Sequence, residues 1–186
     1  MPFDHFGLIA PLFSRVEYSS LETMLEQADL PVPGRVLDAG GGTGRVASAI
    51  RKHAGEVVIA DPSLGMLRQA DQTQLRLACS NSESLPFPNN FFERVVMVDA
   101  LHHVIDHAKT AREMYRVLKP GGRIVIEEPD IHSFYVKLIA VAEKLLLMRS
   151  HFLSPQKIAD LFLFDSAKVD IYAADNNAWV VIEKPG

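Results

Sequence analysis

The stretch Arg35–Gly44, RVLDAGGGTG, decides the fold class of this chain. A short β-branched run ends in Asp38, glycines then occupy every second position from Gly40, and a helical stretch follows near residues 44–54. A glycine turn at this point lets a ligand lie against bare backbone. The dinucleotide fingerprint G-x-G-x-x-G would require its third glycine at position 45, where this chain has Arg45. The turn is therefore G-x-G-x-G, with an acid two residues ahead of it.

Short apolar runs alternate with helical segments on the C-terminal side of this turn. The runs are strand candidates, at residues 36–38, 57–61, 75–78, 95–98, 124–127, 168–173 and 178–183. The segments between them are helix candidates, near residues 63–71 and 106–118, the second closed by Lys119-Pro120-Gly121-Gly122. Continuous apolar strands separated by helices predict a doubly wound, Rossmann-like α/β fold, with a mostly parallel sheet covered by helices on both faces. A site in such a fold lies at the carboxyl ends of the strands.

The 186 residues are expected to form a single domain, because domains average roughly 150 residues. Residues 1–30 form a predicted N-terminal helical cap, and the run Leu30–Gly34 with two prolines ends it. Residues 35–128 form the predicted ligand-binding core. Residues 129–186 hold further helices and the last two strands.

Composition and charge exclude several classes of function. The formal net charge is −4, and the longest basic run is Arg51-Lys52, which argues against a nucleic-acid partner. The single Cys79 excludes an internal disulfide and is expected to be a buried, inert thiol. The apolar region 131–152 is interrupted by charges, so we expect no stable membrane insertion. With no secretory signal at the N-terminus, a cytoplasmic location is expected.

The acid ahead of the glycine turn indicates the kind of ligand. A carboxylate there repels a pyrophosphate but suits an ammonium or sulfonium charge, and S-adenosylmethionine carries both. With this cofactor in view, the chain resembles the class I S-adenosylmethionine-dependent methyltransferases. The closest likeness is to the ubiquinone and menaquinone C-methyltransferases and their small-molecule relatives. Further segments carry the resemblance, namely DPSLGML at 61–67, NSESLPF at 81–87, VDALHHV at 98–104 and LKPGGR at 118–123.

The resemblance implies a seven-stranded sheet whose last strand is antiparallel, and it implies a cofactor site. Asp61, which ends the second strand 21 residues after Gly40, would accept hydrogen bonds from the ribose hydroxyls. Met66 and the backbone at Pro62 would contact the adenine, and so would the Asn81 side chain and the Ser82 amide. The complete set of expected cofactor contacts is Asp38, Gly40, Gly42, Gly44, Asp61, Pro62, Met66, Asn81, Ser82 and Asp99.

Methyl transfer from a sulfonium is an in-line displacement, so the protein mainly has to orient the reactants and exclude water. A small-molecule acceptor, apolar or aromatic, is expected. A general base is needed where the acceptor must lose a proton. The candidates follow the fourth and fifth strands, and they are Asp99, His102, His103 and Asp130.

Other features have competing explanations. His103 and His107 have the spacing of metal ligands on a helix, but no third ligand follows at a metal-site spacing, so no metal is expected.

The apolar stretches 131–152 and 161–164 would pack on the sheet or on a second copy of the chain, or form a lid over an apolar substrate. Trp179 is expected in the core. The pair Glu127-Glu128 would either face solvent or act in catalysis.

Two other functions remain open at this point. A nicotinamide-dependent dehydrogenase is compatible with the strand, the turn and the spacing of Asp61, but Asp38 and Arg45 oppose it. A non-catalytic domain that binds adenosylmethionine or adenosylhomocysteine is also compatible. The resembled quinone methyltransferases have a Tyr-Asp pair near the N-terminus where this chain has Phe13-Ser14, and an aspartate where it has Asn81.

Overall fold

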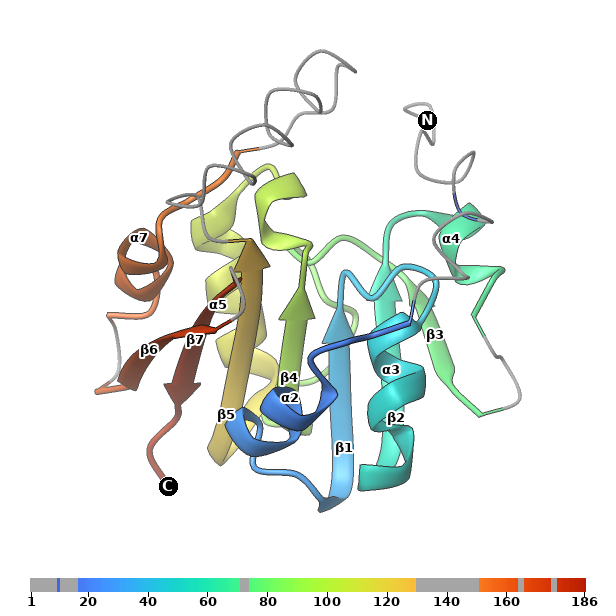
Figure 1. The fold of residues 1–186 in the computed structure, drawn as a ribbon, viewed down its shortest axis with the longest axis horizontal. Coiled ribbons are helices and arrows are strands. Elements are labelled where there is room, and N and C mark those ends of the chain that lie inside the picture. The colour runs from blue at the N-terminus through green and yellow to red at the C-terminus, as the bar shows by residue number, and fades with distance from the viewer. Residues whose placement is uncertain (1–9, 11–16, 71–73, 130–150, 164–165, 175–176) are drawn as a thin grey trace.

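The computed structural model describes residues 10, 17–70, 74–129, 151–163, 166–174 and 177–186. The alternating apolar runs form one seven-stranded sheet of order β3-β2-β1-β4-β5-β7-β6 (Figure 1). The strands are β1 (Val32–Ala39), β2 (Ala54–Asp61), β3 (Arg76–Cys79), β4 (Phe92–Val98), β5 (Leu118–Pro129), β6 (Lys168–Ala174) and β7 (Asn177–Glu183). Strands β1 to β5 are parallel to one another, whereas β7 is antiparallel to both β5 and β6. The predicted doubly wound fold with an antiparallel last strand is confirmed.

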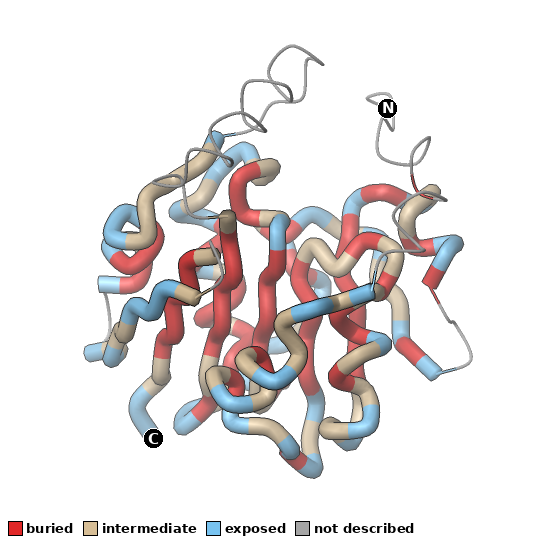
Figure 2. Tube along the Cα trace, in the orientation of Figure 1, coloured by how far each residue is buried: buried red, intermediate tan, exposed pale blue. Residues whose placement is uncertain are grey.

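Helices cover both faces of the sheet. The helices are α2 (Leu21–Gln27), α3 (Arg45–Ile50) with the 3₁₀ turn η1 (Arg51–His53), α4 (Leu64–Leu67), the 3₁₀ turn η2 (Leu101–His103), α5 (His107–Val117) and α7 (Pro155–Asp160). Helices α2 and α3 lie in front of the sheet and α5 lies behind it (Figure 1). Successive strand residues point to opposite faces, so Val36 packs in one core cluster and Leu37 in the other. The carboxyl halves of β1 and β4 are therefore buried, and so is that of β5 as far as Glu128 (Figure 2).

The helix boundaries follow from local capping. Asp106 precedes α5, and its carboxylate accepts a hydrogen bond from the Lys109 amide. Ser154 does the same for α7, whose first residue is Pro155. Helix α5 ends at Val117, just before the predicted stop at residues 119–122. Those residues join β5, so this strand is longer than the predicted run at 124–127.

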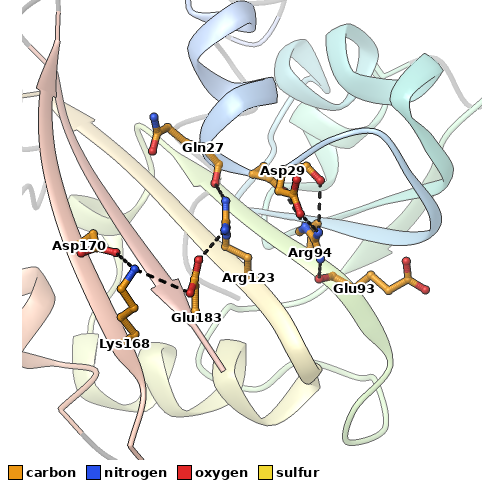
Figure 3. Close-up of polar contacts among 9 residues, drawn as sticks. Gln27, Asp29, Glu93, Arg94, Arg123, Lys168, Asp170 and Glu183 are labelled. Carbon is orange, nitrogen blue, oxygen red and sulfur yellow. Dashed lines mark hydrogen bonds and ion pairs between the residues drawn. The ribbon is translucent and has the colours of Figure 1, made fainter. Parts of the chain in front are cut away.

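Two arginines of the sheet hold the C-terminal end of α2 (Figure 3). Arg94 donates to the Ala28 carbonyl at 2.5 Å and to the Asp29 carboxylate at 2.8 Å. Arg123 donates to the Gln27 carbonyl at 3.0 Å. Carbonyls at a helix C-terminus lack intrahelical partners, and cationic side chains satisfy them well. The C-terminal end of α2 is thereby fixed against the sheet.

Three expectations about single residues can be compared with the structure. Trp179 is buried in β7, as predicted. Cys79 is exposed, so the prediction of a buried thiol is wrong. It ends β3, a four-residue strand at the edge of the sheet. Glu127 and Glu128 are buried and do not face solvent, because polar partners from other elements surround both carboxylates.

Some predictions concern residues outside the described part of the chain. These are the segment 1–9 and 11–16 of the N-terminal cap, the base candidate Asp130 and most of the lid or packing segment 131–152. Among the helices of the described residues, none is long and apolar enough to span a bilayer.

Candidate active site

A cavity of about 920 Å³ lies at the carboxyl ends of β1, β2, β4 and β5. Its volume is near the upper end of the range for small-molecule sites. Most of the residues predicted as cofactor contacts or bases line it, namely Asp38, Gly40, Gly42, Asp61, Pro62, Met66, Asn81, Ser82, Asp99, His102 and His103. Topology brings them together, because parallel strands end at the same edge of the sheet. Gly44 does not line the cavity.

The glycine turn has a left-handed backbone and lies close to the loop after β4. Gly40 has φ +74°, and a Cβ there would lie 2.6 Å from the Cβ of Ala100. Gly42 has φ +52°, and its amide donates to the Asp61 carboxylate at 3.0 Å. Side chains rarely tolerate this left-handed conformation. Gly44 serves packing, since a Cβ there would come within 3.0–3.3 Å of the side chains of Ile59, Ala70 and Leu75.

Two carboxylates, those of Asp38 and Asp61, stabilise the glycine turn and the segments beside it by accepting backbone amides. One oxygen of Asp38 accepts the Ala47 amide of α3 at 3.0 Å, and burial raises the pKa of Asp38 to about 7. Asp61 accepts the Ser63 amide at 2.7 Å with the oxygen that Gly42 does not use. A carboxylate oxygen has two acceptor sites, so Asp61 retains the capacity to accept hydrogen bonds from ribose hydroxyls.

Replacing Asp38 with asparagine is expected to change how stability depends on pH. Between pH 4 and 7 folded Asp38 keeps a proton that the unfolded chain has released, so this residue lowers stability as the pH rises. D38N removes that effect and can still accept the Ala47 hydrogen bond. Its free energy of unfolding should therefore rise relative to wild type between pH 4 and 8, by on the order of a few kcal/mol. Urea titrations across this range measure it, and a difference independent of pH would contradict the raised pKa.

The other end of the cavity is formed by the loops after β2 and β3. Ser63 caps α4 by accepting the Met66 amide at 3.1 Å, which places Met66 beside Gly42. The loop after β3 turns at Asn81, whose carbonyl accepts the Ser84 amide at 3.0 Å. Ser82 in this turn is buried. These residues form an apolar and amide-rich wall, which suits a flat heteroaromatic ring.

The partner of His102 is Glu128, a pairing that the sequence did not reveal. Glu128, at the end of β5, accepts the amides of Ala100 and Leu101 at 3.0 and 2.7 Å with one oxygen. Its other oxygen lies 2.5 Å from Nδ1 of His102. The His102 ring stacks on Phe152, with centroids 4.4 Å apart, and both residues line the cavity. The available signal was that Glu128 directly follows the predicted strand at 124–127, whose carboxyl end was expected to face the site, as was that of the strand before His102.

His103 and Asp99 lie beside this pair. The ring centroid of His103 is 3.9 Å from that of His102. Burial, assisted by His102, lowers the pKa of His103 to about 3, so its ring is neutral at pH 7. Asp99 has φ +52°, and its pKa is raised by partial desolvation, although its side chain is 45% exposed, and by the nearby charge of Glu128. Its carboxylate accepts a hydrogen bond from Arg45 at 2.9 Å.

Glu127 belongs to a separate polar cluster, and it does not line the cavity. Its carboxylate accepts hydrogen bonds from the Tyr18 hydroxyl and the Asn177 amide, both at 2.6 Å. Burial raises the pKa of Glu127 and that of Tyr18. The Tyr18 ring lies 5.3 Å from the guanidinium of Arg45. The cluster thus connects the segment before α2 to the edge of the cavity.

Among the described residues, no group of three or more His, Cys, Asp or Glu side chains is arranged to hold a metal ion. His103 and His107, the pair with metal-ligand spacing, differ in their surroundings. His103 lines the cavity, whereas His107 begins α5 outside it.

The central part of the chain is similar in sequence to known proteins. Residues 37–126 match the model of a family described as "Methyltransferase domain". The ubiquinone/menaquinone biosynthesis C-methyltransferase UbiE of Coxiella burnetii (strain Dugway 5J108-111) is 40% identical over 115 residues, which are 56% of this chain and 46% of that protein. The chain therefore aligns with less than half the length of this relative.

Solved structures show the same fold. A SAM-dependent methyltransferase from Thermotoga maritima has a TM-score of 0.78 at 22% identity, covering 96% of this chain and 98% of its own. The [4+2]-cyclase SpnF has a TM-score of 0.74 at 15% identity, covering 97% and 94%. At these identities the likeness establishes the fold alone, and the cyclase illustrates that one fold supports different reactions.

Proposed function

We infer that this chain, whose residues 37–126 match the family described as "Methyltransferase domain", is a class I S-adenosylmethionine-dependent methyltransferase that transfers a methyl group from this cofactor to a small molecule. The observation that carries the inference is the cavity at the strand ends. It combines a bare glycine turn, the two buried carboxylates Asp38 and Asp61, and a histidine that a buried glutamate orients.

The residues present fit the cofactor. Gly40 and Gly42 leave space for a ligand against the backbone, which side chains would fill. Asp61 can accept hydrogen bonds from ribose hydroxyls, and Met66 offers an apolar surface to the adenine. Asp38 supplies negative charge in its ionised form, and a sulfonium or ammonium group bound on this side would favour that form over the protonated form that burial stabilises. A pyrophosphate would be repelled there, which weighs against a nicotinamide-dependent dehydrogenase.

When bound, the cofactor supplies a sulfonium-linked methyl group, which is electrophilic without further activation. The protein's contribution is then orientation and proton removal. Val104, Ile105, Pro129 and Phe152 line the cavity and offer apolar surface to an acceptor. Glu128 holds the proton on Nδ1 of His102, so that Nε2 can take a proton from a phenol, an acidic carbon or an amine. We propose His102 as the general base and Glu128 as its positioning residue.

The acceptor is therefore expected to be a small apolar or aromatic molecule with an ionisable proton. His103 and Asp99 remain candidates for contacts with it, although the lowered pKa of His103 makes this residue a weak base. A domain that binds the cofactor without methyl transfer is the second candidate. The oriented His102 favours the enzyme, because cofactor binding alone needs no such group.

Thermal unfolding in the presence of S-adenosylhomocysteine, S-adenosylmethionine and NAD tests the cofactor. A ligand at 100 times its Kd adds about 2.7 kcal/mol, or roughly 5–10 °C for a domain of this size. We expect both sulfur ligands to raise the Tm and NAD to leave it unchanged. A panel of phenols and quinones, assayed for release of S-adenosylhomocysteine, then tests transfer. Absence of any shift with the sulfur ligands at millimolar concentration would refute the proposal.

A further inference from the structure

A second cavity, of about 450 Å³, lies beside the amino-terminal halves of β4 and β5 and shares no lining residue with the first. Its volume is within the range of small-molecule sites. Among the described residues, the charged side chains that line it are those of Asp29, Arg94, Arg123, Lys168, Glu183 and Lys184. We propose that this cavity binds the phosphoryl group of a small phosphate monoester.

Four of these charged side chains form a row across the sheet (Figure 3). Arg94 on β4 is in register with Arg123 on β5. Glu183 on β7 is in register with Arg123 on one side and with Lys168 on β6 on the other. Side chains in register point to the same face of a sheet whose strands are about 4.8 Å apart, so the two arginines are direct neighbours. Like charges in this position repel each other, and an anion beside them removes the repulsion.

The protein's own groups satisfy this row only in part. Among the described residues, Arg123 uses two of the five N–H donors of its guanidinium, for the Gln27 carbonyl and the Glu183 carboxylate. The Lys168 side chain is 66% exposed. Its ammonium lies 2.8 Å from Asp170, which does not line the cavity, and 4.0 Å from Glu183. Donors of Arg123 and Lys168 are therefore available to a ligand.

A phosphoryl group fits these donors better than a carboxylate does. Its three terminal oxygens accept hydrogen bonds from several directions, and guanidinium groups bind such oxygens in pairs. Four cationic and two anionic side chains line the cavity, an excess of two positive charges that matches a phosphate monoester near pH 7. The cavity is larger than a phosphate ion, and Gly121 and Gly122 line it without side chains, so there is room for the ester group.

Titrations with glycerol 3-phosphate, inorganic phosphate and succinate at constant ionic strength test the site. The ¹H–¹⁵N signals of the arginine Nε–H groups report contact at Arg94 and Arg123. We expect glycerol 3-phosphate to shift them saturably, with a Kd at least about threefold below those of phosphate and succinate. K168Q should raise this Kd about fivefold, because it removes a charge-assisted hydrogen bond. E183Q should lower it about threefold, because Glu183 competes with the ligand for Arg123.

Strand β2 offers matched controls. Glu56 also pairs with two cations, Arg35 at 3.0 Å and Arg76 at 3.4 Å, and Arg76 is likewise an exposed residue at the start of an edge strand. R76Q and E56Q change the net charge as K168Q and E183Q do, but neither residue lines the cavity. Both controls should keep the wild-type Kd for glycerol 3-phosphate.

Three results overturn the inference. They are the absence of a saturable shift, equal weakening in K168Q and R76Q, and binding of phosphate or succinate as tight as that of glycerol 3-phosphate. Equal weakening would show general electrostatic attraction without a site. The outcome is independent of the proposed function, because none of these titrations contains S-adenosylmethionine.

Discussion

Replacing Glu128 with glutamine is expected to slow methyl transfer by about 100-fold or more, with little change in the affinity for S-adenosylhomocysteine. The glutamine oxygen can still accept the amides of Ala100 and Leu101, so the loop after β4 should keep its course. The glutamine NH₂ would then face Nδ1 of His102 and donate to it. The ring would carry its own proton on Nε2, and that nitrogen could no longer act as a base.

The measurement is single-turnover transfer to an acceptor that wild type methylates, together with the ¹⁵N shifts of the His102 ring, which report its tautomer. E113Q is the matched control. Glu113 also accepts a backbone amide, that of Leu85 at 2.8 Å, and it pairs with Arg116, but it does not line the cavity. E113Q should retain wild-type turnover. A changed tautomer in E128Q with unchanged turnover would exclude His102 as the base.

Replacing Gly40 with alanine is expected to reduce the affinity for S-adenosylhomocysteine at least about tenfold. The added Cβ would lie 2.6 Å from the Cβ of Ala100, so the turn or the loop after β4 must shift. Both of these segments line the cavity. The left-handed conformation of Gly40 adds a cost of about 1–2 kcal/mol for any side chain. Titration calorimetry and urea unfolding measure the two effects.

G121A is the matched control for the cost of placing a side chain in the left-handed conformation. The φ of Gly121 is +72°, close to that of Gly40, but a Cβ there would meet no atom within 4 Å. G121A should therefore lose a similar amount of stability from the backbone alone and keep wild-type affinity for the ligand. Equal losses of affinity in G40A and G121A would show that general destabilisation, and not the close approach to Ala100, limits binding.

The cavity has two halves. One half, the proposed cofactor site, is built from residues close to β1, β2 and β3, and the other half from residues that follow β4 and β5. Because one fold supports different reactions, the second half is the part to test for the reaction performed. For this chain, the oriented His102 is the feature of that half with the clearest chemical consequence.

Local sequence determined the strands and the glycine turn. Apolar runs of strand length end in Asp38 and Asp61, and the structure places each at the end of its strand. Such signals are readable because periodicity and glycine conformations depend on neighbouring residues. They also predicted which residues would meet at one edge of the sheet, since parallel strands end together. The family resemblance also implied a cofactor contact at Gly44; this residue does not line the cavity, and a Cβ there would come within 3.0–3.3 Å of neighbouring side chains.

Tertiary structure alone decided burial at the ends of elements and the pairing of charges. Cys79 is exposed because its strand forms an edge, and Glu128 is buried because His102 and two loop amides surround it. The partners are distant in sequence, with 26 residues from His102 to Glu128, 54 from Arg45 to Asp99 and 109 from Tyr18 to Glu127. No local pattern encodes such pairs. They form where the sheet order brings strand ends together, and there the desolvation of each charge requires a partner.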